Sequence, residues 1–211
     1  MLRAVPLTPE ISLHLAEPGR GLFDATGGEF HSDRPPPFWS FAWAGGQALA
    51  RYVLDHPDAV RGRRVTDLGT GSGLVAIAAA KAGAAEVTAV DSDPEAVAAA
   101  LRNAAANDVT IAATVSRPAP ADVVLAGDAF YTVRVAEQMT AALVAARRAG
   151  ARVLVGDPGR GYFPEHLFDR RAEYDVPVPP ALEEAETLTT IVWEMQNTMR
   201  SATNNLYATS I

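Results

Sequence analysis

The chain contains no cysteine among its 211 residues. It therefore has no disulfide bond, no thiolate ligand for a metal and no cysteine nucleophile. The four histidines, His14, His31, His56 and His166, are scattered along the chain at intervals that match no metal-binding motif. These absences predict a protein without a metal and without thiol chemistry.

Long hydrophobic runs are missing as well. No stretch of the sequence approaches the roughly 18 consecutive apolar residues that a membrane-spanning helix needs. The first twenty residues, MLRAVPLTPEISLHLAEPGR, lack the basic and then apolar pattern of a secretory signal. We therefore expect a cytoplasmic protein that has no membrane partner.

Positive charge is scarce, since Lys81 is the only lysine and the formal net charge is −7. An acidic surface repels the phosphates of nucleic acids, so we expect no nucleic-acid partner. The same surface leaves room for a basic substrate group such as a lysine ammonium. The composition nevertheless favours the plainer interpretation that the acidic surface only keeps the protein soluble.

From residue 64 onward, short β-prone runs alternate with alanine-rich helical stretches. The predicted strands are 64–68, 86–90, 110–115, 122–126 and 152–156. The predicted helices are 74–82, 94–107 and 133–148, the second with a proline in its first turn. This alternation predicts an α/β protein with a Rossmann-like, doubly wound and mostly parallel sheet, covered by helices on both faces.

The last third of the chain changes this rhythm. Residues 173–178 and 187–195 are strand-like, but the Pro-Pro segment between them is too short for a right-handed crossover. An antiparallel hairpin suits this spacing and completes a seven-stranded sheet. We therefore predict one domain over residues 1–195, which includes an entry segment over 1–43. The polar tail, 196–211, lacks periodicity and is expected to be loosely ordered.

The most informative stretch is a glycine-rich turn between the first strand and the first helix of this series. Gly69, Gly71 and Gly73 follow Asp67 in the pattern D-x-G-x-G-x-G. Glycines let the backbone turn sharply and come close to a ligand. A dinucleotide-binding turn has the spacing G-x-G-x-x-G and binds a pyrophosphate, which Asp67 would repel. The pattern therefore argues against a dehydrogenase and favours a cofactor with an amino group and a sulfonium.

Asp91 ends the next strand, 18 residues after Gly73. A carboxylate at that place can accept hydrogen bonds from both hydroxyls of an adenosine ribose. Together with Asp67, it makes the glycine pattern a much more specific signal than the glycines alone.

Two later strands also end in acidic segments, GDAFY from Gly127 and GDPGRGY from Gly156. Ligands of open parallel sheets bind beyond the carboxyl ends of the strands. We therefore expect Asp128 and Tyr131 to face the reacting end of the cofactor. For Asp157 and Arg160 an ordinary Asp-Pro-Gly turn explains the sequence equally well.

An aromatic segment precedes the first strand of the series. Trp39, Phe41 and Trp43 could line a ligand pocket, although aromatic residues are as often part of the core. Gly45 and Gly46 follow and could open a helix.

Four segments together resemble the electron-transfer-flavoprotein β-subunit lysine methyltransferases, a family of seven-β-strand class I methyltransferases. They are PPPFWSFAWAGGQALARYVLD (35–55), VTDLGTGSGLVAIAAAKAGA (65–84), VVLAGDAFYT (123–132) and VLVGDPGRGYF (153–163). The resemblance spans about residues 8–195. It implies S-adenosylmethionine as cofactor, S-adenosylhomocysteine as product, no metal, and a lysine ε-amine as acceptor. The implied partners are the electron transfer flavoprotein β-subunit or a ribosomal stalk protein.

The resemblance also implies roles for individual residues. Asp128 and Tyr131 match a substrate-side D-x-x-Y motif and are the predicted catalytic residues, and Trp43 matches a cofactor contact. The predicted cofactor-binding residues are Trp43, Asp67, Gly69, Thr70, Gly71, Gly73, Asp91, Ser92 and Gly127. The loop 116–121, SRPAPA, departs from the pattern because it lacks an acidic or amide side chain for the adenine amino group.

Two further functions fit the same core. A small-molecule methyltransferase would share the glycine turn, and only GDAFY and the aromatic segment favour a protein acceptor. The other is a non-catalytic S-adenosylmethionine-binding module. The presence of Asp67, Asp91 and Asp128 argues against it. Methylation of nucleic-acid bases is disfavoured, because GDAFY stands in place of the N/D-P-P-Y/F segment of those enzymes.

Overall fold

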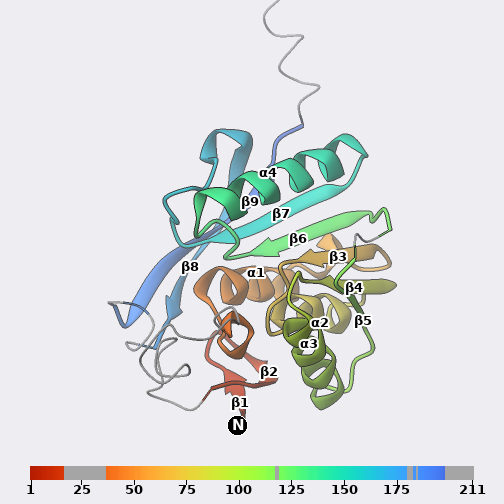
Figure 1. Ribbon diagram of the computed structural model, residues 1–211, viewed down its shortest axis with the longest axis vertical. Helices are drawn as coiled ribbons and strands as arrows, with labels where there is room; N and C mark the ends of the chain where they lie inside the picture. The colour runs from red at the N-terminus through yellow and green to blue at the C-terminus, as the bar shows by residue number, and fades with distance from the viewer. Residues whose placement is uncertain (17–36, 117–118, 180–182, 184, 198–211) are drawn as a thin grey trace, which may run out of the picture.

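A computed structural model describes residues 1–16, 37–116, 119–179, 183 and 185–197. Within these residues one sheet contains β3 Arg64–Leu68, β4 Glu86–Val90, β5 Ala112–Thr114, β6 Val123–Gly127, β7 Arg152–Asp157, β8 Phe168–Pro177 and β9 Thr187–Met195. Its strand order is β5-β4-β3-β6-β7-β9-β8 (Figure 1). Strands β3 to β7 pair in parallel, whereas β9 pairs antiparallel with both β7 and β8. The predicted seven-stranded, mostly parallel sheet with a terminal antiparallel hairpin is confirmed.

The predicted strands and helices agree closely with the structure, with one exception. Strand β8 begins at Phe168, five residues before the predicted start at residue 173. It is an edge strand whose second to fourth residues, Asp169 to Arg171, are exposed. An exposed edge lacks the apolar alternation that marks a strand in the sequence, so the early part of β8 was missed.

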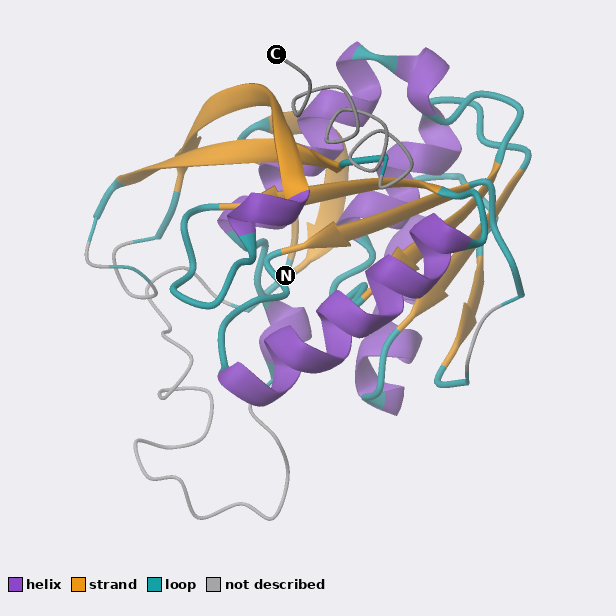
Figure 2. Ribbon diagram, turned by 90° about the horizontal axis from the view of Figure 1, so that it is seen from above, coloured by secondary structure: helices purple, strands orange, loops and turns teal. Residues whose placement is uncertain are grey.

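Helices cover both faces of the sheet, as predicted (Figure 2). They are α1 Ala44–Asp55, α2 Leu74–Lys81, α3 Pro94–Ala106 and α4 Val133–Arg148. Alternate side chains of the central strands divide between the two faces. Leu125 and Leu154 pack with α1 and α2, while Val124 and Val153 pack with Leu143 of α4.

A hairpin of β1 Leu2–Val5 and β2 Thr8–His14 lies outside the sheet and was not predicted. Its Ile11 and Leu13 are fully buried in the core cluster that includes α2 and α3. The hairpin therefore belongs to the folded domain rather than to a separate arm.

Two asparagines, Asn103 in α3 and Asn107 directly after it, hold this hairpin in place. The Asn107 amide accepts a hydrogen bond from Ser12 N at 3.0 Å and donates one to Ser12 O at 2.6 Å, as a neighbouring strand would. Asn103 Oδ1 accepts from His14 N at 2.7 Å, and its Nδ2 donates to Ser72 O at 2.8 Å. Asn103 thereby connects the hairpin to the glycine-rich turn.

Three glycines, Gly45, Gly127 and Gly156, let α1 lie directly on the ends of β6 and β7. A Cβ atom added to Gly156 would lie 2.1 Å from Gly45 O, and one added to Gly127 would lie 2.7 Å from the Cα of Gly46. No real Cβ atom tolerates such a distance, so this backbone-to-backbone contact requires glycine. The contact brings the start of α1 to the carboxyl ends of the parallel strands, where ligands of such sheets bind.

Other predictions concern residues that the structure leaves undescribed. Residues 198–211 of the predicted tail and 17–36 of the entry segment lie outside the described residues, and the domain boundaries stay a prediction. In the part of the chain that is described, none of the helices is long and apolar enough to cross a membrane.

Candidate active site

The glycine-rich turn leads from β3 into α2 and is hydrogen-bonded to the last residue of β4. Both Gly69 N and Thr70 N donate hydrogen bonds to Val90 O, at 2.8 and 3.0 Å. Gly69 and Gly71 have φ values of +69° and +51°, in the left-handed region that glycine adopts without strain. The backbone conformation of the turn thus explains the first two glycines.

The third glycine serves a different purpose. Gly73 has φ +84° and precedes the first residue of α2. A Cβ atom there would lie 2.8 Å from the Cα of Ala100 in α3. Gly73 therefore allows α2 to begin close against α3, and it does not line the pocket described next.

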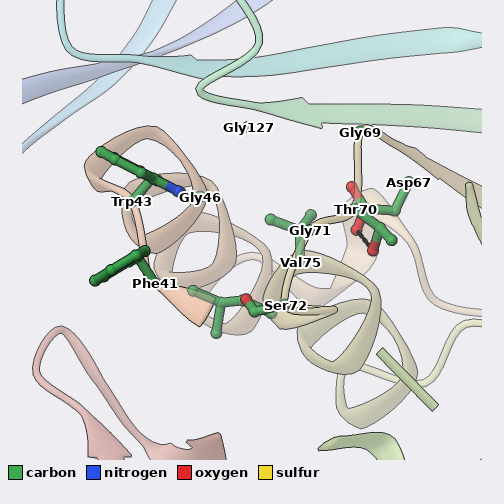
Figure 3. Close-up of a pocket in the computed structure, with 11 residues that line it drawn as sticks. Phe41, Trp43, Gly46, Asp67, Gly69, Thr70, Gly71, Ser72, Val75 and Gly127 are labelled. Atoms are coloured by element: carbon green, nitrogen blue, oxygen red, sulfur yellow. Dashed lines mark hydrogen bonds between the residues drawn. The ribbon is translucent and has the colours of Figure 1, made fainter. Parts of the chain in front are cut away.

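A pocket opens between this turn and the aromatic segment before α1. Phe41 and Trp43 lie on one side of it, and Asp67 with Thr70 on the other (Figure 3). The lining residues are Phe41, Trp43, Gly46, Asp67, Gly69, Thr70, Gly71, Ser72, Leu74, Val75 and Gly127. Six of the nine predicted cofactor-binding residues are in this set. Gly46, Ser72, Leu74 and Val75 were not predicted to bind the cofactor. Gly46 was expected only to open a helix, Ser72 lies within the glycine-rich turn, and Leu74 and Val75 follow it.

Asp67 fastens the turn to the start of α2. Its Oδ2 accepts hydrogen bonds from Thr70 Oγ1 at 2.6 Å and from Ala76 N at 3.1 Å. Burial raises the pKa of this carboxyl group to about 7, although the two hydrogen bonds favour the ionised form. The group can therefore change its protonation state near neutral pH, depending on what binds beside it.

Asp91 contacts the turn from the end of β4. Its Oδ2 accepts from Gly71 N at 2.9 Å, and its Oδ1 accepts from Asp93 N at 3.1 Å. A carboxylate oxygen has two acceptor positions, so each oxygen can still accept a hydroxyl group. Asp91 and the exposed Ser92 do not line the pocket, but Asp91 is bonded directly to a lining residue.

Asp128 follows Gly127, a lining residue, and has φ +56°. Its Oδ2 accepts from Gly45 N at 2.9 Å, in the first turn of α1, and its Oδ1 accepts from Arg160 Nε at 2.7 Å. Only 6% of the side chain is exposed. The carboxylate expected to face the substrate is thus already held by two donors.

The second of these donors comes from the turn after β7. Asp157 Oδ1 accepts from Gly159 N at 2.8 Å and from Arg160 N at 2.7 Å, which shapes the turn. The Arg160 guanidinium then contacts Asp128 and also donates through Nη2 to Glu183 Oε1 at 2.7 Å. The sequence left open whether Asp157 and Arg160 form an ordinary turn or take part in the site, because spacing alone does not show which carboxylate an arginine meets.

Tyr131 lies at the mouth of the site, with 45% of its surface exposed. Its ring centroid is 5.4 Å from that of Phe38. Partial burial and the negative charges of Asp91 and Asp128 raise the pKa of the phenol, so the hydroxyl keeps its proton and can donate a hydrogen bond. Trp43 is fixed nearby, since its Nε1 donates to Phe38 O at 2.8 Å.

The chemistry of these residues fits S-adenosylmethionine. Phe41, Trp43, Leu74 and Val75 offer apolar surface, Asp67 offers negative charge to an ammonium, and Asp91 offers acceptors to a ribose. No arginine or lysine is among the described lining residues, whereas a phosphate-bearing cofactor would favour one. Across the described ranges, no group of three His, Asp or Glu side chains is arranged to hold a metal ion.

Comparison with known proteins identifies relatives over most of the chain. A family model described as "Ribosomal protein L11 methyltransferase (PrmA)" matches residues 48–145. The electron transfer flavoprotein beta subunit lysine methyltransferase of Rattus norvegicus is 38% identical over 200 residues, which cover 89% of this chain and 77% of the relative. The Homo sapiens protein of the same name is 37% identical over 209 residues, covering 90% and 76%.

A solved structure supports the fold independently. The ribosomal protein L11 methylase from Lactobacillus delbrueckii subsp. bulgaricus matches with a TM-score of 0.53 at 21% identity, covering 78% of this chain and 91% of that one. The glycine turn, the strand order and these relatives agree with one another. The chain belongs to the electron transfer flavoprotein beta subunit lysine methyltransferase family and is an S-adenosylmethionine-dependent methyltransferase.

Proposed function

We propose that this methyltransferase modifies a lysine ε-amine on the electron transfer flavoprotein β-subunit. The names of its relatives support this acceptor. The observation that carries the proposal is the buried Asp128 carboxylate directly after the pocket residue Gly127, with the half-exposed Tyr131 at the mouth. This arrangement suits an amine that enters from outside and must be aligned at the cofactor.

When bound, S-adenosylmethionine supplies an electrophilic methyl group, and the electrons of the broken carbon–sulfur bond stay on sulfur to give S-adenosylhomocysteine. The acceptor must be a neutral amine. A free lysine has a pKa near 10.4, so reaching the neutral form at pH 7 costs about 4.6 kcal/mol. The site must therefore both align the amine and let its proton leave.

Asp128 and Tyr131 divide this task. Asp128 captures and positions the amine, and it is a poor choice for proton removal, because a lone carboxylate raises the pKa of a nearby lysine. The Tyr131 hydroxyl orients the amine by a hydrogen bond, and burial of the acceptor disfavours its charged form. The proton passes to water.

The first test combines the protein with labelled S-adenosylmethionine and purified flavoprotein β-subunit, and separately with a ribosomal stalk protein, the other acceptor expected from the sequence. Label on a lysine of the β-subunit, located by peptide mapping, is the expected result. Label on the stalk protein alone would show that the stalk protein, and not the flavoprotein β-subunit, is the acceptor. Cofactor binding by calorimetry without label on either protein would favour a small-molecule acceptor instead.

Variants test the assigned roles on the same acceptor. We expect Asp128→Asn and Tyr131→Phe to lower kcat/KM by about tenfold or more, since each removes an aligning contact. Tyr174→Phe is a matched control, because Tyr174 lies on the edge strand β8. Full activity of Asp128→Asn would show that the carboxylate does not position the amine.

A further inference from the structure

Asp128, Arg160 and Glu183 form a continuous chain of ion pairs beside the cofactor pocket. Arg160 donates through Nε to Asp128 Oδ1 at 2.7 Å and through Nη2 to Glu183 Oε1 at 2.7 Å, with a longer contact from Nη1 to Glu183 Oε2 at 3.4 Å. All three side chains are largely shielded from water, with exposures of 6%, 24% and 15%. Ion pairs in such surroundings are screened much less than those at the surface.

The guanidinium is also held in one place. Its backbone N–H is bonded to Asp157 Oδ1, and its planar fork is shared between carboxylates from two different segments. A lysine at this position could not make the same set of directed bonds. The chain thus builds a fixed positive charge 2.7 Å from the carboxylate that the proposed function assigns to the acceptor amine.

The surrounding groups show what this charge offsets. Three further ionisable groups face Arg160 and Asp128: Asp157 at the end of β7, Glu183 between β8 and β9, and Tyr131 before α4. Asp91 at the end of β4 contributes by raising the pKa of Tyr131. Three of the groups around Arg160, namely Asp128, Asp157 and Glu183, are carboxyls. Without Arg160 they would hold the proton on an incoming ammonium, which cannot accept a methyl group.

We propose that Arg160 is a positioning residue for methyl transfer: it fixes the Asp128 carboxylate and partly offsets the negative charge of Asp128 and Glu183, so that the acceptor amine meets less negative charge. The amine is then aligned by Asp128 without being locked in its protonated form. This inference rests on the proposed function in taking an amine as the acceptor and Asp128 as the carboxylate that aligns it.

The test is the pH dependence of methylation between pH 6 and 10 for the wild type, Arg160→Gln, Arg160→Lys and the control Arg170→Gln. Arg170 is an exposed arginine that also pairs with a glutamate, Glu173. Each protein is assayed on the flavoprotein β-subunit and on Nα-acetyl-lysine amide, and calorimetry checks that its cofactor affinity is unchanged.

Arg160→Gln should move the pH midpoint of kcat upward by about one unit, because the carboxylates then act unopposed on the amine. At pH 7 this appears as a roughly tenfold loss of kcat that disappears near pH 10, with KM unchanged or lower. Arg160→Lys keeps the charge and should keep the wild-type midpoint at a reduced kcat. Arg170→Gln should match the wild type.

The outcomes separate this inference from the proposed partner. A loss of activity in Arg160→Gln that is equal at every pH, or a raised KM without a shifted midpoint, overturns the role of Arg160 and leaves the acceptor standing. If the pH midpoint shifts with the small amide and the flavoprotein β-subunit is not methylated, the role of Arg160 is supported and the proposed protein acceptor is contradicted. If the wild type methylates no amine at all, both proposals fall.

Discussion

At the scale of single residues, Asp67 holds the glycine-rich turn in place, but its burial makes the ionised form of its carboxyl group unfavourable. It is 1% exposed, and folding raises its pKa from 3.8 to about 7. A carboxyl with a raised pKa contributes its full stability below pH 3.8 and loses that contribution as the pH rises through about 7. At pH 8 the cofactor-free protein therefore carries a buried charge that a bound ammonium would compensate.

We accordingly expect Asp67→Asn to separate stability from cofactor binding. The amide oxygen can still accept from Thr70 Oγ1 and Ala76 N, both of which contact one oxygen of the carboxylate. The melting temperature at pH 8 should stay equal or rise, while the Kd for S-adenosylmethionine increases by about tenfold or more. Thermal melts and calorimetry at pH 6 and pH 8 measure both quantities. Unchanged cofactor affinity would contradict the assignment of Asp67.

At the scale of secondary-structure elements, the contact between α1 and the ends of β6 and β7 is the tightest in the site. Gly156→Ala would place a Cβ atom 2.1 Å from Gly45 O, and a backbone carbonyl cannot move away without shifting α1. We expect a loss of about 3 kcal/mol or more in the free energy of unfolding, measured by urea denaturation. Gly161→Ala is the control, since nothing lies within 4 Å of its added Cβ atom. Equal stability of the two variants would show that the contact is loose.

Asn103 and Asn107 allow a second comparison between elements. Asn103→Ala and Asn107→Ala each remove partly buried hydrogen bonds to β2 and should each cost about 2–4 kcal/mol of unfolding free energy. Only Asn103 also bonds Ser72, which lines the pocket. Asn103→Ala should therefore weaken cofactor binding measurably by calorimetry, whereas Asn107→Ala should not. Equal cofactor affinity in the two variants would rule out this connection.

The same elements show what could be predicted from the sequence. Helix 133–148 and strands 64–68, 86–90 and 187–195 were predicted with the bounds observed, because buried periodic segments have strong local patterns. Strand β2 was missed: it pairs with β1, and the other hydrogen bonds that hold it come from asparagine side chains about 90 residues later, which no local pattern reveals. The partners of Asp128 were missed for the same reason: Gly45 and Arg160 are 83 residues before it and 32 after it.

At the scale of the whole molecule, negative charge predominates, since the formal net charge is −7. At the start of β3 and β7 the arginines are balanced by carboxylates, because Arg64 pairs with Asp122 and Arg152 with Glu194. At the carboxyl ends of the strands lie the acidic residues Asp91, Asp128 and Asp157. Such a distribution attracts a basic acceptor towards the active-site end.

This negative charge predicts that the KM for a basic acceptor depends on ionic strength. Raising NaCl from about 50 to about 500 mM should increase the KM for the flavoprotein β-subunit several-fold, because the Debye length falls from about 14 to about 4 Å. The kcat should change little, since the buried ion pairs near the cofactor are screened much less. Initial rates at saturating cofactor measure both values. A KM that does not depend on salt would indicate that apolar contacts alone bring the acceptor to the site.

The docking of the amino-terminal hairpin on α3 has a consequence for the order in which the protein is made. Ser12 leaves the ribosome 95 residues ahead of Asn107, the residue that holds it. At 5–20 residues per second, about 5–19 s of synthesis separate the two. During that interval Ile11 and Leu13 have no α3 to cover them. The hairpin is thus translated well before it can reach its native position, and the growing chain must keep it from aggregating until α3 emerges.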